Sequence, residues 1–105
     1  MRAKKTDANQ KEIIEALRQV GVTVFDTSAV GRGFPDLVIG WQGVNYLVEV
    51  KTEKGKPTDF QVNFFTHWRG QVVLVRNVKD IFNFLGIKGL NDEGETAERK
   101  RRCNI

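Results

Sequence analysis

Three charged residues in the middle of this 105-residue sequence have the types and spacing of a hydrolytic site. Asp36 follows a proline, and a single residue separates Glu49 from Lys51. In an extended strand alternate residues share a face, so the side chains of Glu49 and Lys51 point the same way. Two carboxylates beside an ammonium group can hold a divalent cation and stabilise negative charge that develops on a reacting oxygen.

A hairpin would bring Asp36 and Glu49 opposite each other. The Gln-Gly pair at residues 42–43 suits a turn between two apolar runs, and a turn centred there pairs Asp36 with Glu49. Facing side chains in an antiparallel pair have Cβ atoms only about 4.5–5.5 Å apart, and like charges there destabilise the sheet. Lys51 or a bound Mg²⁺ would supply the compensating charge, and Mg²⁺ suits the site better because it keeps waters for substrate oxygens. A surface hairpin with three solvated charges is the alternative interpretation.

Glu12 is a further candidate for this site. It flanks the apolar stripe of a helix predicted over residues 8–20, whereas Glu15 lies on the solvent side of the same helix. From that edge Glu12 can reach toward Asp36, with Asn9 one turn earlier to orient it. The alternative is a solvated glutamate at the boundary of the apolar face.

Gln61 has two competing interpretations. The spacing Thr58-x-x-Gln61 is typical of a capping box, in which the glutamine serves only the start of a helix. Gln61 also lies on the predicted inward face of that helix, where a glutamine needs polar partners such as Lys51 or a metal-bound water. We favour the second role. The aromatic residues around it are interpreted as core residues rather than as a platform for stacking bases: Phe60, Phe64, Phe65 and Trp68.

The elements that must position these residues follow from hydrophobic periodicity and from turn signals. Helices are predicted over residues 8–20, 59–69 and 78–85, and strands over residues 22–25, 36–39, 45–51 and 71–76. Helix starts are indicated by Asp7 with Gln10, by Thr58 with Gln61 and by Asn77, and helix ends by Gly21, Gly70 and Gly86. This order predicts an α/β fold with a mixed central sheet flanked by helices.

Length and composition exclude several classes of protein. We expect one domain over residues 1–86 and a flexible charged tail over residues 87–105. One cysteine, Cys103, excludes an intrachain disulfide and a multi-cysteine zinc site, and one histidine, His67, disfavours a histidine-based triad. No apolar run approaches the length of about 18 residues that a membrane span needs, so we expect a cytoplasmic protein without a membrane partner.

The charge pattern favours a polyanionic partner. The formal net charge is +4, which is weak evidence by itself. Arg32 precedes Asp36 in a glycine-rich loop, and Lys54 and Lys56 lie in the loop that follows Lys51. Because both loops lie at the end of the hairpin that carries Asp36, we expect these three cations to contact such a partner.

Pro35-Asp36 followed by Glu49-Val50-Lys51, in an αβββαβ frame, resembles the PD-(D/E)xK nuclease superfamily. The segments at residues 31–38 and 46–51 are similar to the central block of its VRR-NUC branch, and Thr58-Asp59-Phe60-Gln61 is similar to the glutamine motif of that branch. The likeness covers residues 7–86. It implies a restriction-endonuclease-like αβββαβ core.

The resemblance also implies a role for each matching residue. Asp36 and Glu49 would be the carboxylate ligands of Mg²⁺ or Mn²⁺, and the backbone carbonyl of Val50 would complete the protein's share. Lys51 would steer the attacking water and balance charge on the phosphate. Glu12 would contribute an outer or second ligand, and Gln61 would be the supporting glutamine of the catalytic set.

The function that the resemblance implies is hydrolysis of DNA phosphodiester bonds by a metal-dependent, structure-specific endonuclease. We therefore expect Arg32, Lys54 and Lys56 to bind DNA phosphates. Since one active site cuts one strand and the chain has no further domain to select a substrate, we expect a homodimer that resolves four-way (Holliday) junctions, as similar single-domain nucleases do. The host would be a bacterial cell, with a phage-encoded form as a variant. A restriction-like or repair nuclease that acts on linear, flap or forked DNA is one alternative, and a non-catalytic DNA-binding module is another.

Overall fold

The computed structural model describes residues 5–88 and has the helix–strand order that the sequence predicts. The elements are α1 (Lys5–Gln19), β1 (Thr23–Asp26), β2 (Leu37–Trp41), β3 (Val44–Val50), α2 (Asp59–His67), β4 (Val72–Val75) and α3 (Val78–Leu85). Within residues 5–88, no helix is long and apolar enough to cross a membrane. From residue 89 onward, the tail that was expected over residues 87–105 lies outside the described residues.

The four strands form one mixed sheet in the order β1-β2-β3-β4. The first two pairings are antiparallel, and β4 runs parallel to β3. Gln42 and Gly43 have positive φ values of 53° and 81°, the combination of a type I′ turn, whose twist matches that of the flanking strands. The expected pairing of Trp41 with Val44 is confirmed. The register therefore places Asp36 directly before the first paired residue of β2.

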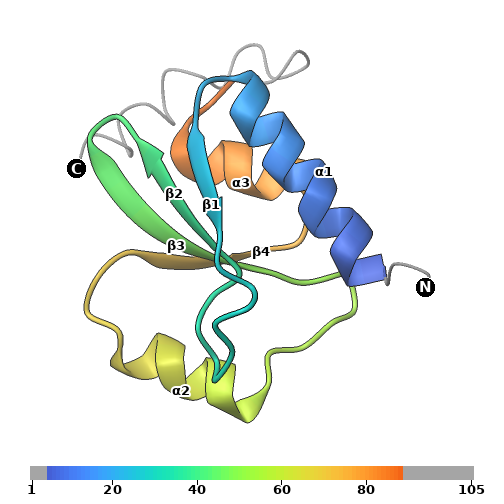
Figure 1. The fold of residues 1–105 in the computed structure, drawn as a ribbon, viewed down its shortest axis with the longest axis vertical. Coiled ribbons are helices and arrows are strands. Elements are labelled where there is room, and N and C mark those ends of the chain that lie inside the picture. The colour runs from blue at the N-terminus through green and yellow to red at the C-terminus, as the bar shows by residue number, and fades with distance from the viewer. Residues whose placement is uncertain (1–4, 89–105) are drawn as a thin grey trace.

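The hydrophobic core lies between one face of the sheet and the two helices α1 and α3 (Figure 1). Each helix contributes a pair of buried residues one turn apart, the spacing that puts two side chains on one helix face. The core residues are Ile13, Leu17, Val22, Leu37, Ile39, Val48, Val50, Val75, Ile81 and Leu85. Because Val48 and Val50 point into this core, the alternate residues Glu49 and Lys51 face the opposite side of the sheet.

Three helix boundaries differ from the prediction, the smallest difference being the end of α1 at Gln19 rather than at residue 20. Helix α1 begins at Lys5 rather than at residue 8, so Asp7 lies inside the first turn and is not the N-cap. A carboxylate in the first turn is still favourable, because it faces the positive end of the helix dipole. Helix α2 ends at His67 rather than at residue 69, since Trp68 has extended backbone angles of φ −74° and ψ 129°.

Helix α2 stands apart from the core, and the prediction that its aromatic side chains are core residues is wrong. No residue of Asp59–His67 is buried. Phe60 is 71% exposed and Trp68 is 43% exposed. Figure 1 shows the reason: α1 and α3 lie together against the sheet, whereas α2 lies beyond its end, beside the loop between β1 and β2. The ring of Phe64 packs edge-on against Phe34 of that loop, with centroids 5.5 Å apart.

Gly33 lets the loop between β1 and β2 approach the first turn of α2. Its φ is +84°, and a Cβ added to it would lie 2.6 Å from the carbonyl oxygen of Phe60. Gly31 has a similar φ of +75°, but a Cβ there would meet nothing within 4 Å. Both glycines thus have the left-handed backbone conformation, and only Gly33 lies against the backbone of α2.

We predict that Gly33→Ala lowers the free energy of unfolding by about 1–3 kcal/mol more than Gly31→Ala does, because only the first substitution pushes against the backbone of α2. Both substitutions place an alanine in the left-handed backbone region, which destabilises each variant equally. The difference between their free energies of unfolding therefore measures the contact of Gly33 with Phe60. Urea denaturation of the two variants measures it. Equal losses of stability in both variants would contradict the close packing of loop and helix.

Candidate active site

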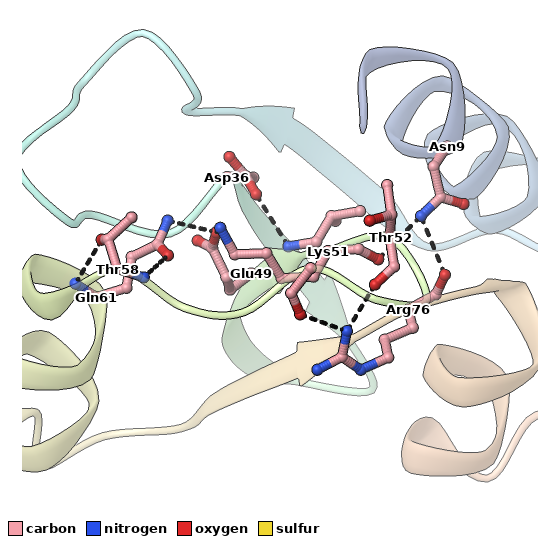
Figure 2. Close-up of polar contacts among 10 residues, drawn as sticks. Asn9, Asp36, Glu49, Lys51, Thr52, Thr58, Gln61 and Arg76 are labelled. Carbon is pink, nitrogen blue, oxygen red and sulfur yellow. Dashed lines mark hydrogen bonds and ion pairs between the residues drawn. The ribbon is translucent and has the colours of Figure 1, made fainter. Parts of the chain in front are cut away.

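The structure brings Asp36, Glu49, Lys51 and Gln61 together at the end of the hairpin (Figure 2). Asp36 directly precedes β2. Glu49 lies near the end of β3 and Lys51 directly follows that strand, while Gln61 lies in the first turn of α2. The Nζ atom of Lys51 lies 3.5 Å from Oε2 of Glu49. Gln61 Nε2 donates a hydrogen bond of 2.7 Å to the same oxygen. The Oε2 atom of Glu49 thus contacts both Lys51 and Gln61.

Asp36 is fixed by backbone groups on both sides. Its Oδ2 accepts a hydrogen bond of 2.9 Å from the N–H of Val50, and its carbonyl accepts one of 2.8 Å from the N–H of Thr27. Along β3, Leu47 and Lys51 donate their N–H groups toward β4, so Val50 directs its backbone groups toward Asp36. The carbonyl of Val50 therefore lies on the side of the strand where the Asp36 carboxylate is.

Glu49 is a buried carboxyl group with an unpaired oxygen. The residue is 1% exposed, and its Oε1 has no hydrogen-bond partner among the described residues. Burial raises the pKa of Glu49 to about 7, and the negative charge of Asp36 adds to this effect, while Lys51 opposes it. A carboxylate costs free energy in such a place unless a positive charge joins it.

Gln61 forms the predicted capping box, and its side chain also contacts the Glu49 carboxylate rather than the expected Lys51. Its Oε1 accepts a hydrogen bond of 2.9 Å from the N–H of Thr58, and its own N–H donates one of 3.2 Å to the Thr58 hydroxyl, which completes the capping box. The Nε2 at the other end of the amide holds Glu49. The start of α2 is thereby linked to the carboxyl group on β3.

The donor set fits a hard divalent cation. It consists of two carboxylates and a backbone carbonyl, and oxygen atoms are the ligands that Mg²⁺ prefers. The unpaired, buried Oε1 of Glu49 is the atom that such an ion would satisfy. Within the described part of the chain, no group of three or more His, Cys, Asp or Glu side chains is placed to hold a metal. Any ion here would therefore keep several waters, as Mg²⁺ commonly does.

A comparison with solved structures finds a chain described as "VRR_NUC domain". The two share 33% sequence identity and a TM-score of 0.64, over 75% of this chain and 91% of that one. This chain belongs to the VRR-NUC family. No family model matches the sequence, and no curated protein does. The membership confirms the resemblance seen in the sequence, and it identifies this chain as a nuclease domain with a restriction-endonuclease-like α/β fold.

In this VRR-NUC domain Glu12 does not join Asp36 and Glu49. Its side chain is exposed on α1. Asn9, one turn earlier on the same side of the helix, instead lies at the ends of the two parallel strands, where its Nδ2 donates to the carbonyls of Lys51 (3.1 Å) and Arg76 (3.0 Å). That side of α1 thus meets β3 and β4, whereas Asp36 lies across β3 on the side of β2.

The three cations that were expected to bind DNA flank the site in two loops of the VRR-NUC domain. Arg32, Lys54 and Lys56 are all exposed. Arg32 has a positive φ of 58° between two glycines that also have positive φ, so a tight left-handed segment presents it to solvent. Arg76 was not among the site residues predicted from the sequence. One available signal was its position as the last residue, and the charged one, of the apolar strand predicted over residues 71–76.

We predict that Glu49→Gln stabilises the metal-free VRR-NUC domain at pH 8 by an amount on the order of 1–3 kcal/mol, because it removes a buried charge. The folded-state pKa of about 7 lies above the ordinary value of 4.5. Protonated Glu49 therefore makes its full contribution to the free energy of unfolding below pH 4.5, and this contribution is lost as the pH rises through 7. The advantage of the glutamine variant should disappear at pH 4.5.

Urea denaturation with a chelator at pH 4.5, 6 and 8 measures this difference. Glu15→Gln, at an exposed position on α1, is the matched control and should leave the stability unchanged at all three pH values. A glutamine variant at position 49 that is less stable than the wild type at pH 8 would contradict the burial of an uncompensated carboxylate.

Proposed function

We propose that this nuclease domain is a divalent-metal-dependent endodeoxyribonuclease that hydrolyses phosphodiester bonds. The observation that carries the proposal is the buried Glu49, whose Oε2 is held by Lys51 and Gln61 while its Oε1 has no partner within residues 5–88. A fold gains no stability from a buried carboxyl group with an unpaired oxygen. Such an arrangement is typical of a site that is completed by a ligand.

Each residue of the site has a role in the proposed reaction. Asp36, Glu49 and the Val50 carbonyl would hold Mg²⁺ or Mn²⁺. Such an ion lowers the pKa of a bound water and stabilises charge on phosphoryl oxygens. The ammonium group of Lys51, 3.5 Å from Oε2 of Glu49, would orient a water and balance the charge of the transition state.

Gln61 has a supporting role in this proposal. Its amide holds Oε2 of Glu49, which leaves Oε1 free to face an ion. Because the same amide caps α2, movement of that helix would displace Glu49. Glu12 belongs to the proposed site only as an outer ligand, acting through water, because its side chain is exposed on α1.

The proposed substrate is a four-way DNA junction, and the proposed active form is a homodimer. One active site cuts one strand, and a junction is resolved by two matched cuts. The exposed apolar side chains of the domain support a partner surface of this kind, since a single copy leaves Phe25 and Phe60 each 71% exposed. A second copy of the chain would cover such groups.

Restriction-like or repair activity on linear, flap or forked DNA is the second candidate function, because the same carboxylates and lysine would cut any phosphodiester that reaches them. A non-catalytic DNA-binding module is a weaker candidate. The burial of Glu49 with an unpaired oxygen favours an ion-binding site over a surface that only holds DNA.

We predict that the domain cleaves a four-way junction in Mg²⁺ or Mn²⁺ and that Lys51→Ala reduces the cleavage rate about 10²–10³-fold, because a fixed cation is lost from the transition state. Chelation should abolish cleavage. Lys79→Ala, at an exposed position on α3, removes the same charge and should cleave at the wild-type rate. Gel assays on junction, fork, flap and linear duplex measure both the rate and the preference.

Preferential cutting of linear duplex in that assay would support the second candidate function, and cleavage without divalent ions would contradict the metal proposal. Sedimentation of the domain with junction DNA at micromolar concentration tests the dimer. Only monomeric complexes there would refute it.

We predict that the affinity for DNA falls steeply as the salt concentration rises, because Arg32, Lys54 and Lys56 would contact phosphates. Each such contact adds about 0.9 to the slope of log K against log salt concentration. The double variant Lys54→Ala/Lys56→Ala should therefore have a slope that is smaller by about 2. Fluorescence anisotropy from 50 to 200 mM salt measures the slope, and an unchanged slope would remove these two lysines from the DNA-binding surface.

A further inference from the structure

Arg76 ties the loop after β3 to the end of β4 (Figure 2). Its Nη1 donates to the carbonyls of Thr52 (2.6 Å) and Gly55 (2.7 Å), with a longer contact of 3.3 Å to that of Glu53. Next to it, Asn77 Nδ2 donates to the Glu53 carboxylate at 3.2 Å. Three carbonyl groups of the loop, within residues 52–55, are thus held by one guanidinium group.

The catalytic lysine is held by other contacts. The N–H of Lys51 donates to the Val75 carbonyl at 3.0 Å, which continues the parallel ladder. The Lys51 carbonyl accepts from Asn9. Neither contact uses the Arg76 guanidinium. The backbone at Lys51 and the loop after it therefore have separate anchors, although they are adjacent in the chain.

The loop that Arg76 holds carries Lys54 and Lys56, both exposed. A loop of this kind, with charged residues and a glycine, loses conformational freedom when it binds DNA, and the lost entropy weakens binding. Hydrogen bonds that order the loop in advance remove part of that cost. Carbonyl oxygens are good partners for a cation, so these bonds are stronger than neutral ones.

We propose that Arg76 is a positioning residue for substrate binding: its guanidinium holds the loop at residues 52–56 in the shape that presents Lys54 and Lys56 to the DNA backbone. The proposal rests on the proposed DNA-cleaving function. In this proposal Arg76 contributes to DNA binding, whereas Asp36, Glu49 and Lys51 act in the hydrolysis step. The Nη1 atom of the half-buried Arg76 is already engaged with loop carbonyls, so its part is to shape the loop rather than to contact phosphate.

The first test separates binding from chemistry. Arg76→Met should raise KM and the Kd for a four-way junction about tenfold while kcat stays within about twofold of the wild-type value. Lys79→Met, which removes an equal charge from an exposed position on α3, should change neither. A fall in kcat with unchanged KM would overturn the proposal.

The second test separates a positioning role from a direct contact. If Arg76 acts through the two lysines, Arg76→Met should weaken binding no further in the background Lys54→Ala/Lys56→Ala, so the effects are strongly non-additive. If Arg76 itself contacts phosphate, the losses in binding free energy add. Additive losses would therefore overturn the proposal.

The third test needs neither DNA nor activity. Trypsin cleaves after Lys54 only when the loop opens, so Arg76→Met should increase the rate of cleavage at the Lys54–Gly55 bond about tenfold, measured by mass spectrometry under conditions in which the domain stays folded. Arg76→Lys should restore part of the protection from trypsin, because the lysine ammonium group is also a charged donor, with three N–H groups. This variant also keeps the test open if Arg76→Met does not fold.

The tests also distinguish the two proposals from each other. Unchanged proteolysis in both Arg76 variants would refute the loop-holding role even if Lys51→Ala proves inactive. Increased proteolysis and weakened DNA binding, in a domain that cleaves no DNA, would uphold the role of Arg76 and refute the nuclease activity proposed for this site.

Discussion

The constraint on which this domain depends is the burial of one carboxyl group, that of Glu49, on the side of the sheet opposite the core. Transfer of a carboxylate out of water is costly, and the raised pKa of Glu49 reflects that cost. Lys51 and Gln61 compensate one of its oxygens but not the other. Three parts of the fold are held in relation to this group: the hairpin, the end of the parallel strand pair and the start of α2.

The sheet achieves this arrangement with two kinds of pairing. The antiparallel hairpin of β2 and β3 carries the carboxyl groups of Asp36 and Glu49 to one end of the sheet. The parallel partner β4 brings Arg76 to the same end, beside the loop that follows Lys51. Asn9 closes the gap between the two strand ends from α1. The residues of the proposed site and the loop after β3 are thus held by neighbouring but separate sets of side-chain hydrogen bonds.

The three helices have different positions relative to the sheet, and this difference explains their different roles. Helices α1 and α3 cover one face and complete the core, so α2 contributes nothing buried. Its place is set by the capping box, by the contact of Gln61 with Glu49 and by the close approach of Gly33. Phe64 also packs against Phe34, and the contact of Gln61 with Glu49 couples the helix to the site. Phe60, in the first turn of α2, is 71% exposed.

The sequence by itself determined what depends on neighbours in the chain. The turn at Gln42 and Gly43 and the two-residue period of strands set the register that places Asp36 beside Glu49, and the capping box predicted the start of α2. Only the tertiary structure decided that Glu12 stays in solvent, that Phe60 and Trp68 lie outside the core, and that Arg76 holds the loop after β3. These outcomes depend on how α1, α2 and β4 pack against segments that are far away in the chain. The periodicity of a helix or strand shows which of its own faces is apolar, but not which other element that face will contact.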